Sequence, residues 1–382
     1  MELLLNEDER QLREAARVFW SEQSGPAALR RLRADPGALG FDGALWQRMG
    51  EMGWPAMLLP EAVGGLDFGF KGIGAVFEQG GRQLSVSPLL ASVVLGGGLL
   101  LRAGSDAQRQ AWLPGIASGA TLFALALDET PRHDPRQIRT RAVRDADGWR
   151  LDGDKWLVLD GHVAQRLVVA ARTAGAAGQE EGISLFLVDP ASAGVQVERT
   201  LMTDSRNAAR VRLSGVRLAP DALLGDEGAG FACLDAVLDQ ARVCLAAEAM
   251  GVMREAFERT LAYLKERVQF DVVLASFQAL QHRMARLHVR LELCASAVAA
   301  ALAAQDDDAA DDARRAALAS LAKAMVADLS ELLLNEAVQL HGGIGVTDEL
   351  DIGLFLKRGR AIQQTFGDAT FHRDRYARLK GF

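Results

Sequence analysis

The feature that most constrains the fold of this 382-residue chain is a series of long segments without helix breakers in its C-terminal part. Residues 231–269 contain no proline, and Gly251 is their only glycine. At about 1.5 Å per residue, a single helix there would approach ~60 Å. The stretches 276–305 and 312–340 have the same character, and a fourth segment follows residue 350. Long helices with short connections predict an antiparallel four-helix bundle.

The first 120 or so residues are also predicted to be helical. Asn6 precedes three acidic residues, so it can cap a helix whose first turn carries carboxylates. A second apolar stripe at helical spacing consists of Leu45, Met49 and Met52. Further helix-compatible segments lie at 70–83, 87–103 and 105–117.

The pattern changes near Thr121, where short β-rich runs begin and continue to about residue 218. They comprise residues 138–143, 149–151, 156–159, 167–171, 183–188 and 211–213. Asp-Gly pairs at 147–148, 152–153 and 160–161 are predicted turns. Short strands at close spacing predict a small antiparallel barrel or sandwich, and the absence of β-α-β alternation argues against a Rossmann domain.

The resulting fold class is α+β with three domains. We expect an N-terminal helical domain over 1–120, a central β domain over 121–225 and a C-terminal helical bundle over 226–382.

The composition argues against several classes of function. There are 43 basic and 50 acidic residues, a net charge of −7, which argues against nucleic-acid binding. The three cysteines lack any CxxC spacing, so we expect neither disulfides nor thiolate metal sites and favour a reducing cytoplasm. The acidic start lacks the basic region of a secretory signal, and the longest apolar run, 89–101, is too short to span a membrane.

No metal or nucleophile motif is present. The six histidines form no HExxH pattern, and no Gly-x-Ser-x-Gly elbow occurs. The acidic residues at 306–308 and 311–312 are interpreted as a solvated loop tip that leads into the next helix. The glycine-rich stretch 341–347 follows a predicted helix rather than a strand, so it fails the context of a dinucleotide fingerprint. It is either a helix stop or a place where a phosphate approaches the backbone.

Several motifs in order along the chain resemble the acyl-CoA dehydrogenase family of flavoproteins. In the C-terminal part these are Arg267-x-x-Phe270, a glutamine eleven residues after that arginine, and Gln-x-x-Gly-Gly at 339–343 before Thr-x-Glu at 347–349. Earlier matches are the Pro-Glu…Gly-Gly stretch at 60–65, Leu-Pro-Gly at 113–115 and the glycines at 228 and 230. The resemblance covers nearly the whole length and implies the same helix–β–helix order.

The resemblance implies an FAD site shared between two subunits. The C-terminal domain of one subunit holds the adenosine diphosphate half of its neighbour's FAD. Arg267 would then bind the pyrophosphate, Gln278 and Gln339 would hydrogen-bond the diphosphate or the adenosine part, and Phe270 would pack on the cofactor. The implied cofactor-binding set is Arg267, Gln269, Phe270, Phe277, Gln278, Gln339, His341, Gly342 and Gly343.

The family reaction needs a carboxylate that removes the proton alpha to a thioester. Relatives carry this glutamate in one of two places, and here these hold Phe366 and Ala241. No catalytic residue is therefore assigned, although a relocated base at Asp368 is one alternative. Asp239 and Arg242 keep a family spacing near the acyl-CoA site, where they would be either substrate contacts or an internal ion pair.

The flavin-ring contacts also depart from the family pattern. The stretch 127–135 lacks the family's Gly-Ser pair, and a Trp-x-Thr or Trp-x-Ser contact falls on 157–159, Leu-Val-Leu. Leucine cannot donate a hydrogen bond to flavin.

The simplest interpretation is a base-lacking subunit of an α2β2 acyl-CoA dehydrogenase, like those of steroid side-chain degradation or the pimeloyl-CoA dehydrogenase small subunits. Its implied partners are an acyl-CoA, a second dehydrogenase subunit and an electron-transfer flavoprotein. A self-sufficient homotetramer and a flavin-free structural or CoA-binding protein stay open as alternatives.

Overall fold

The computed structural model describes residues 3–35, 37 and 39–382, which form two compact units. The helical unit comprises Met1–Ala34, Phe70–Ser85 and Arg242–Phe382. The sheet unit comprises Asp35–Gly69 and Val86–Ala241.

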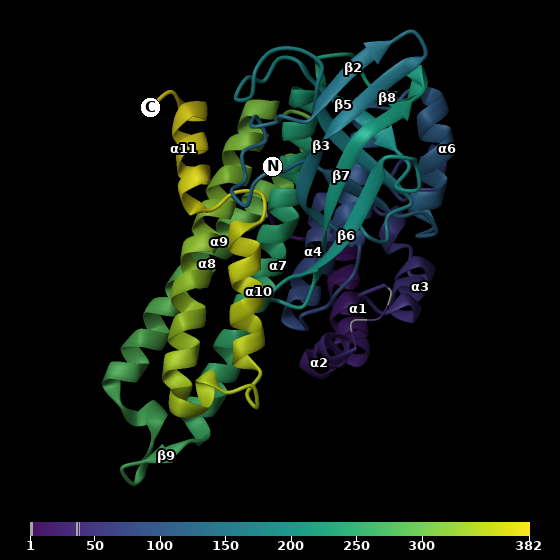
Figure 1. The fold of residues 1–382 in the computed structure, drawn as a ribbon. Helices are drawn as coiled ribbons and strands as arrows, with labels where there is room; N and C mark the ends of the chain where they lie inside the picture. The colour runs from purple at the N-terminus through teal and green to yellow at the C-terminus, as the bar shows by residue number, and fades with distance from the viewer. Residues whose placement is uncertain (1–2, 36, 38) are drawn as a thin grey trace. The chain divides into compact units, whose positions relative to one another are not determined.

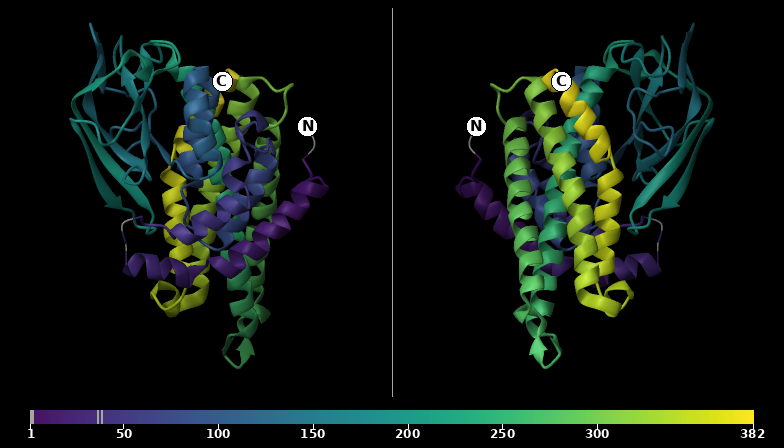
Figure 2. Two further views of the ribbon diagram at one scale, coloured as in Figure 1. Left: turned by 90° about the vertical axis from the view of Figure 1, so that its right-hand side faces the viewer. Right: turned by 90° about the vertical axis from the view of Figure 1, so that its left-hand side faces the viewer.

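The long C-terminal helices predicted from the sequence are present in the helical unit (Figures 1 and 2). They are α7 (Gly230–Glu266, whose first turns lie in the sheet unit), α8 (Gln278–Gln305), α9 (Asp312–His341), α10 (Ile352–Gln364) and α11 (Ala369–Lys380). Helix α9 packs against α8, α10 and α11. The fourth predicted segment is thus two helices, since the chain turns between Gln364 and Ala369.

The prediction that the first long helix continues to Gln269 was wrong. Helix α7 ends at Glu266, and a hairpin of β9 (Val268–Gln269) and β10 (Val272–Val273) follows. The two residues between these strands, Phe270 and Asp271, both have left-handed backbone (φ 56° and 64°), as a tight hairpin turn requires.

Three N-terminal helices also belong to the helical unit: α1 (Glu7–Gln23), α2 (Pro26–Ala34) and α4 (Phe70–Arg82). Two short 3-10 helices precede α8 and follow α9: η5 (Leu274–Ser276) and η6 (Gly342–Val346). The predicted cap at Asn6 is confirmed, because its side chain accepts from Glu9 N while the Glu9 carboxylate accepts from Asn6 N. Helix α1 packs on α4, and the Trp20 indole donates to the carbonyl of Val76 (3.2 Å).

The acidic run after α8 makes hydrogen bonds to the starts of two helices. Asp306 reaches the first turn of α4, where its carboxylate accepts from Lys71 N at 2.8 Å. Asp311 caps α9 by accepting from Arg314 N at 2.7 Å. Among the described residues, no group of histidine, cysteine and carboxylate side chains could hold a metal ion.

The sheet unit is built around an eight-stranded sheet of order β6-β7-β3-β2-β4-β5-β8, with β1 beside β4. Its strands are β1 (Phe123–Ala126), β2 (Arg141–Asp145), β3 (Gly148–Leu159), β4 (Arg166–Arg172), β5 (Ile183–Val188), β6 (Val195–Leu201), β7 (Asn207–Leu218) and β8 (Leu223–Leu224). Its helical segments are α3 (Gly43–Glu51), η1 (Trp54–Ala56), η2 (Glu61–Val63), the π-helix η3 (Leu89–Gly97), α5 (Gly98–Ala103), α6 (Asp106–Ala117) and η4 (Pro220–Ala222).

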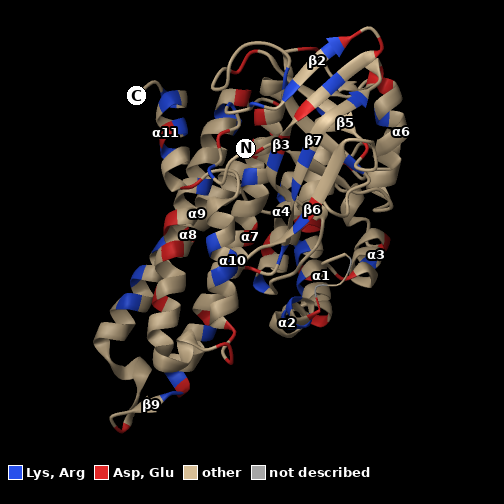
Figure 3. Cartoon of the chain, in the orientation of Figure 1, with Lys and Arg blue, Asp and Glu red and all other residues tan. Residues whose placement is uncertain are grey.

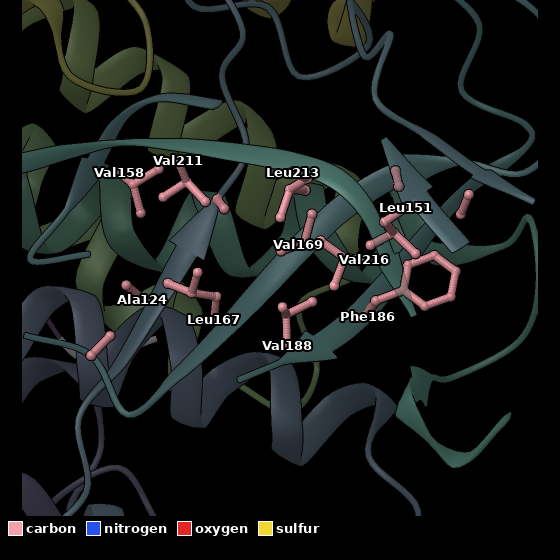
Figure 4. Close-up of a cluster of buried hydrophobic side chains, with 14 of the residues drawn as sticks. Ala124, Leu151, Val158, Leu167, Val169, Phe186, Val188, Val211, Leu213 and Val216 are labelled. Atoms are coloured by element: carbon pink, nitrogen blue, oxygen red, sulfur yellow. The ribbon is translucent and has the colours of Figure 1, made fainter. Parts of the chain in front are cut away.

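Side chains from β1, β3, β4, β5 and β7 point at one another and fill one core (Figure 4). Phe186 lies edge-to-face against Trp149, with ring centroids 5.1 Å apart. The sheet therefore folds over on itself in the manner of a small barrel or sandwich.

Three details differ from the expectations. The sheet is mixed, because β1 and β2 pair in parallel with β4. The predicted turn at 152–153 is instead a register shift inside the single strand β3. Met52 is half exposed at the end of α3, whereas Leu45 and Met49 are buried.

Helix α8 is the one described helix long and apolar enough, by length and composition alone, to cross a membrane. Its apolar residues include Leu287, Leu291 and Val298, which are buried within the helical unit, where α8 packs on α9. Other apolar side chains of the same helix, Val289 and Leu293, are exposed.

Candidate functional site

The ends of α7 and α9 are held together at one end of the bundle. The Tyr263 ring lies 4.4 Å from the His341 ring, and its hydroxyl donates to the carbonyl of His341 at 3.4 Å. Arg267 follows one turn after Tyr263, whose carbonyl accepts from Arg267 N at 2.8 Å. Arg267 is exposed, and no described residue forms an ion pair with it. Its guanidinium is therefore available to a group from outside this chain.

The first turns of α8 lie at the same end of the bundle. Arg283 Nε donates to the Glu336 carboxylate at 2.6 Å and so ties α8 to α9. Gln278 and Gln339 lie close in sequence to this ion pair, and both are exposed. The structure thus brings Arg267, Gln278 and Gln339, three predicted site residues, to one exposed end of the helical unit.

The hairpin after α7 carries an unusual aromatic residue. Phe270 is 85% exposed, although it is apolar and has left-handed backbone, which a bulky residue rarely adopts. The Phe277 ring lies edge-on to it at 6.2 Å and is also exposed. The Gln269 side chain donates to the carbonyl of Val268. Strain and exposure combined in one residue point to a function outside this chain's own packing.

The three glycines after α9 have different roles. Gly345 is required by packing, since a Cβ there would lie 2.3 Å from the carbonyl oxygen of Val338. Gly342 has φ 65° and ends α9. Gly343 has neither a left-handed backbone nor any atom within 4 Å of its hypothetical Cβ. The open face at Gly342 and Gly343 is therefore a place where an external group can approach the backbone.

His341, predicted as a cofactor contact, is turned inward. It is 4% exposed, its Nδ1 hydrogen-bonds the carbonyl of Ala337 at 2.8 Å, and burial lowers the pKa of its imidazole. Its side chain joins α9 to α7, and only the backbone beside it faces the open end.

The turn between α10 and α11 contains Phe366, the residue at one of the two base positions. Phe366 is buried, has φ 56°, and accepts at its carbonyl from Arg242 Nε at 3.2 Å. His372 Nε2 lies 3.1 Å from the same oxygen. Lys323 from α9 donates to the carbonyls of Ile362 (2.8 Å) and Gly367 (3.0 Å). Buried polar groups from three helices thus fix this turn.

The alternative base and the two predicted substrate contacts are also engaged within the fold. Asp368 caps α11, its carboxylate accepting from Phe371 N at 2.8 Å. Arg242 is fully buried and its guanidinium lies 5.5 Å from the Phe371 ring. Asp239 and Ala241 are buried as well, so the second base position holds an inaccessible methyl group.

A buried ion pair that the sequence reasoning missed joins the loop after β1 to strand β3. Lys155 Nζ donates to the Glu129 carboxylate at 2.8 Å and to the carbonyl of Leu127 at 3.0 Å. Burial lowers the pKa of Lys155. For Glu129 burial acts upward, but Lys155 and Thr140 outweigh it and leave the pKa of the carboxyl below its ordinary value. The sequence signal for this pair was a lysine inside a β-rich run, because a charge buried in a sheet needs a partner.

Next to this pair, an aspartate and a histidine of the same loop contact each other. The Asp128 carboxylate lies 2.9 Å from His133 Nδ1, and its carbonyl accepts from Trp156 N at 2.7 Å. The following residue, Leu157, has φ 51° and a half-exposed side chain, at a point where the pairing of β3 with β7 is irregular. This segment presents no side-chain hydroxyl.

Comparison with known proteins identifies the family. Sequence models of the acyl-CoA dehydrogenase N-terminal, middle and C-terminal domains match residues 6–120, 124–216 and 228–379. This chain belongs to the acyl-CoA dehydrogenase family. The acyl-CoA dehydrogenase FadE12 of Mycobacterium tuberculosis is 32% identical over 323 residues, which are 83% of this chain and 82% of that protein.

Solved structures of similar proteins have the same fold. The Tcur3481-Tcur3483 steroid ACAD is 32% identical, with a TM-score of 0.85 and 98% of each chain covered. The ChsE4-ChsE5 complex from Mycobacterium tuberculosis gives 25% identity and a TM-score of 0.88, covering 100% of this chain and 99% of that one.

Acyl-CoA dehydrogenases are FAD-dependent oxidoreductases that act on acyl-CoA. The exposed end of the bundle fits one half of that cofactor, since a guanidinium, two amides and an open glycine backbone suit a diphosphate and its nucleoside. The segment Trp156–Leu159 offers no side-chain hydroxyl to a flavin ring.

Proposed function

We propose that this chain is the subunit of a heteromeric acyl-CoA dehydrogenase that completes its partner's FAD site and supplies no catalytic base. The assembly would be an α2β2 tetramer that oxidises an acyl-CoA thioester at its α,β bond. The partner would carry the base and the flavin-ring contacts. An electron-transfer flavoprotein would accept the electrons.

The observation that carries the proposal concerns the two base positions. The family reaction needs a carboxylate within reach of the alpha proton. One position holds Phe366, whose ring is buried in a turn fixed by Arg242, Lys323 and His372. The other holds Ala241, which is fully buried. Neither side chain takes up a proton, and the nearby Asp368 carboxylate is engaged as the cap of α11.

The exposed end of the bundle supports the other part of the proposal. Arg267 would pair with the pyrophosphate of the partner's FAD, and the backbone at Gly342 and Gly343 would approach it closely. Gln278 and Gln339 would hydrogen-bond the diphosphate or the adenosine. Phe270 and Phe277 would pack on the cofactor, and this packing would explain their exposure. The flavin itself, when bound, accepts the β-hydrogen as hydride.

The relatives support a paired assembly. The steroid ACAD with 32% identity and the ChsE4-ChsE5 complex are each named for two components. We infer for this chain a role in steroid or lipid catabolism in the cytoplasm, beside a second dehydrogenase subunit. Its own substrate would be an acyl-CoA or steroid-CoA thioester.

The test is the flavin-to-chain ratio of the protein expressed alone and co-expressed with a neighbouring dehydrogenase subunit, measured from visible absorption after gel filtration. We expect a ratio near zero alone and one FAD per pair in the complex. A ratio near one for the chain alone would contradict the proposal. The next variant would then be Asp368→Asn, because a self-sufficient enzyme would need that carboxylate as its base. Absence of flavin with every partner would indicate a flavin-free structural or CoA-binding protein.

A further inference from the structure

A cleft outside the FAD-binding end lies among α1, α4, α7 and α8 of the helical unit. Its volume is about 360 Å³, within the range of small-molecule sites. Its lining combines apolar and charged side chains. The apolar side chains include Leu5, Ala75, Ala247, Met250, Val298 and Leu302. The charged ones are Arg10, Arg13, Lys71, Arg254 and a single carboxylate, Glu78.

A second cleft of about 430 Å³ adjoins the first, and Arg13 lines both. It lies farther along α1 and α4, and its lining is polar throughout. The side chains are Arg13, Glu14, Arg17, Ser21, Gln79, Arg82, Gln83 and Glu255. The two clefts together therefore form one groove with an apolar half and a polar half.

The side chains that line this groove are more often basic than acidic. The two linings contain six different cations, Arg10, Arg13, Arg17, Lys71, Arg82 and Arg254, and three carboxylates, Glu14, Glu78 and Glu255. Five of these cations are paired with carboxylates, some of which lie just outside the linings. Figure 3 shows basic and acidic residues interspersed over the helices of the helical unit. An anionic ligand is therefore favoured where a cation of the groove has no carboxylate partner.

Arg13 stands at the junction and has a free guanidinium. The other cations are paired, for example Lys71 with Glu9 (2.9 Å) and Arg254 with Glu78 (3.3 Å). Arg13 is exposed, and no described residue forms a hydrogen bond or ion pair with its side chain. The geometry leaves this cation for a ligand that occupies both clefts.

Gln79 lines the polar half of the groove. Its side chain is 8% exposed, and no described residue hydrogen-bonds its amide. Among the described residues, the amide atoms of Gln79 are not buried polar atoms without a partner, so they stay accessible from the cleft. An acceptor and two donors are therefore available to a ligand there.

Glu78 is the one carboxylate among the described side chains that line the apolar half, and Arg254 pairs with it at 3.3 Å. Burial is the largest influence on Glu78 and raises the pKa of its carboxyl, even though Arg254 acts in the opposite direction. An anion that enters the groove meets Arg13 and Gln79 at its centre and only this carboxylate on the apolar side.

We propose that the groove binds a single-chain amphiphile with an anionic headgroup. The aliphatic chain lies on the apolar residues of α4, α7 and α8, and the headgroup binds Arg13 and the Gln79 amide. This site is separate from the FAD-binding end of the bundle, and the inference does not depend on the proposed dehydrogenase role. A carboxylate and a phosphate headgroup share the required chemistry.

Titration calorimetry of the purified full chain with decanoate, decyl phosphate and decanol tests this proposal. We expect both anionic probes to bind at least tenfold more tightly than decanol, and the stronger of the two identifies the headgroup. Arg13→Gln should weaken anion binding about tenfold, and Gln79→Leu several-fold. Ala295→Trp, which fills the apolar cleft from an accessible position on α8, should weaken all three probes.

The matched control is Arg286→Gln, which removes an exposed arginine of α8 outside both clefts and should leave binding unchanged. Equal affinity for decanol and decanoate would overturn the proposal, as would unchanged binding in Arg13→Gln and Gln79→Leu. Flavin content does not enter the measurement, so its outcome is separate from that of the FAD test. Thermal unfolding of each variant verifies that the fold is intact.

Discussion

Arg242 Nε donates a hydrogen bond of 3.2 Å to the backbone carbonyl of Phe366 inside the helical unit. The family resemblance places Phe366 at one of the two positions where relatives carry the catalytic glutamate. Its backbone is left-handed, and its carbonyl contacts the buried arginine and His372. A turn with this many internal partners is rigid. The departure from the family pattern therefore belongs to the core of the protein and not to a loop that can rearrange.

Arg242→Met tests whether this arginine is structural. Methionine fills similar space but removes the charge-assisted hydrogen bond to Phe366 and the contact with the Phe371 ring. We expect the free energy of unfolding to fall by about 2–4 kcal/mol, measured by urea denaturation. Arg286→Met, an exposed site, should change it by less than about 0.5 kcal/mol. Unchanged stability of Arg242→Met together with lost turnover in the complex would instead indicate a substrate contact.

Lys323→Met tests the pH dependence that the buried lysine introduces. Burial, with the charge of Arg242 next, lowers the pKa of Lys323 to about 7. The unfolded chain, with an ordinary pKa near 10.5, binds more protons between these values. The cost of the buried charge is thus fully present below pH 7 and is relieved as the pH rises. Wild-type stability should increase relative to Lys323→Met by up to about 1.4 kcal/mol per pH unit between pH 7 and pH 10.

The measurement is urea denaturation of both proteins at pH 6, 7.5 and 9. Parallel curves of stability against pH would show that Lys323 stays protonated throughout, held by the carbonyls of Ile362 and Gly367.

The sequence predicted elements where local signals agree with the final structure. The long helices follow from the absence of proline, and the α1 cap follows from Asn6 before acidic residues. The Asp-Gly pair at 152–153 is a turn signal, yet β3 runs through it, because pairing with β7 on both sides outweighs the local preference. The hairpin after α7 was missed because Phe270-Asp271 is not a usual turn pair.

The candidate site was predictable as a set of residues but not as a set of side-chain directions. Motif spacing selects both Gly343 and His341, but only the fold shows that one faces open space and the other is buried. The polar cluster around Phe366 joins α7, α9 and α11, far apart in the sequence. No local pattern relates Arg242, Lys323 and His372, so their shared role is visible only in three dimensions.

Substitution by alanine should affect stability differently at Gly343 and at Gly345. Gly345→Ala would place a Cβ 2.3 Å from the carbonyl oxygen of Val338 and should cost about 1–3 kcal/mol of stability. Gly343→Ala meets no atom within 4 Å and should change stability by less than about 0.5 kcal/mol. It should nevertheless reduce the FAD content of the co-expressed complex, because a methyl group keeps the pyrophosphate from the backbone. If the complex with Gly343→Ala keeps its full FAD content, the open face at Gly343 does not bind the pyrophosphate.

Phe270→Asn should stabilise the free chain while it weakens the complex. Asparagine tolerates the left-handed backbone of a tight hairpin, so the substitution relieves strain and should raise the free energy of unfolding by about 1 kcal/mol. It also removes an 85% exposed phenyl ring that the proposed cofactor contact requires. Thermal unfolding of the isolated chain and flavin content of the complex measure the two effects. Asp271→Gly is the control, because it relieves the same turn and keeps Phe270. If both variants retain full flavin, Phe270 does not contact the cofactor.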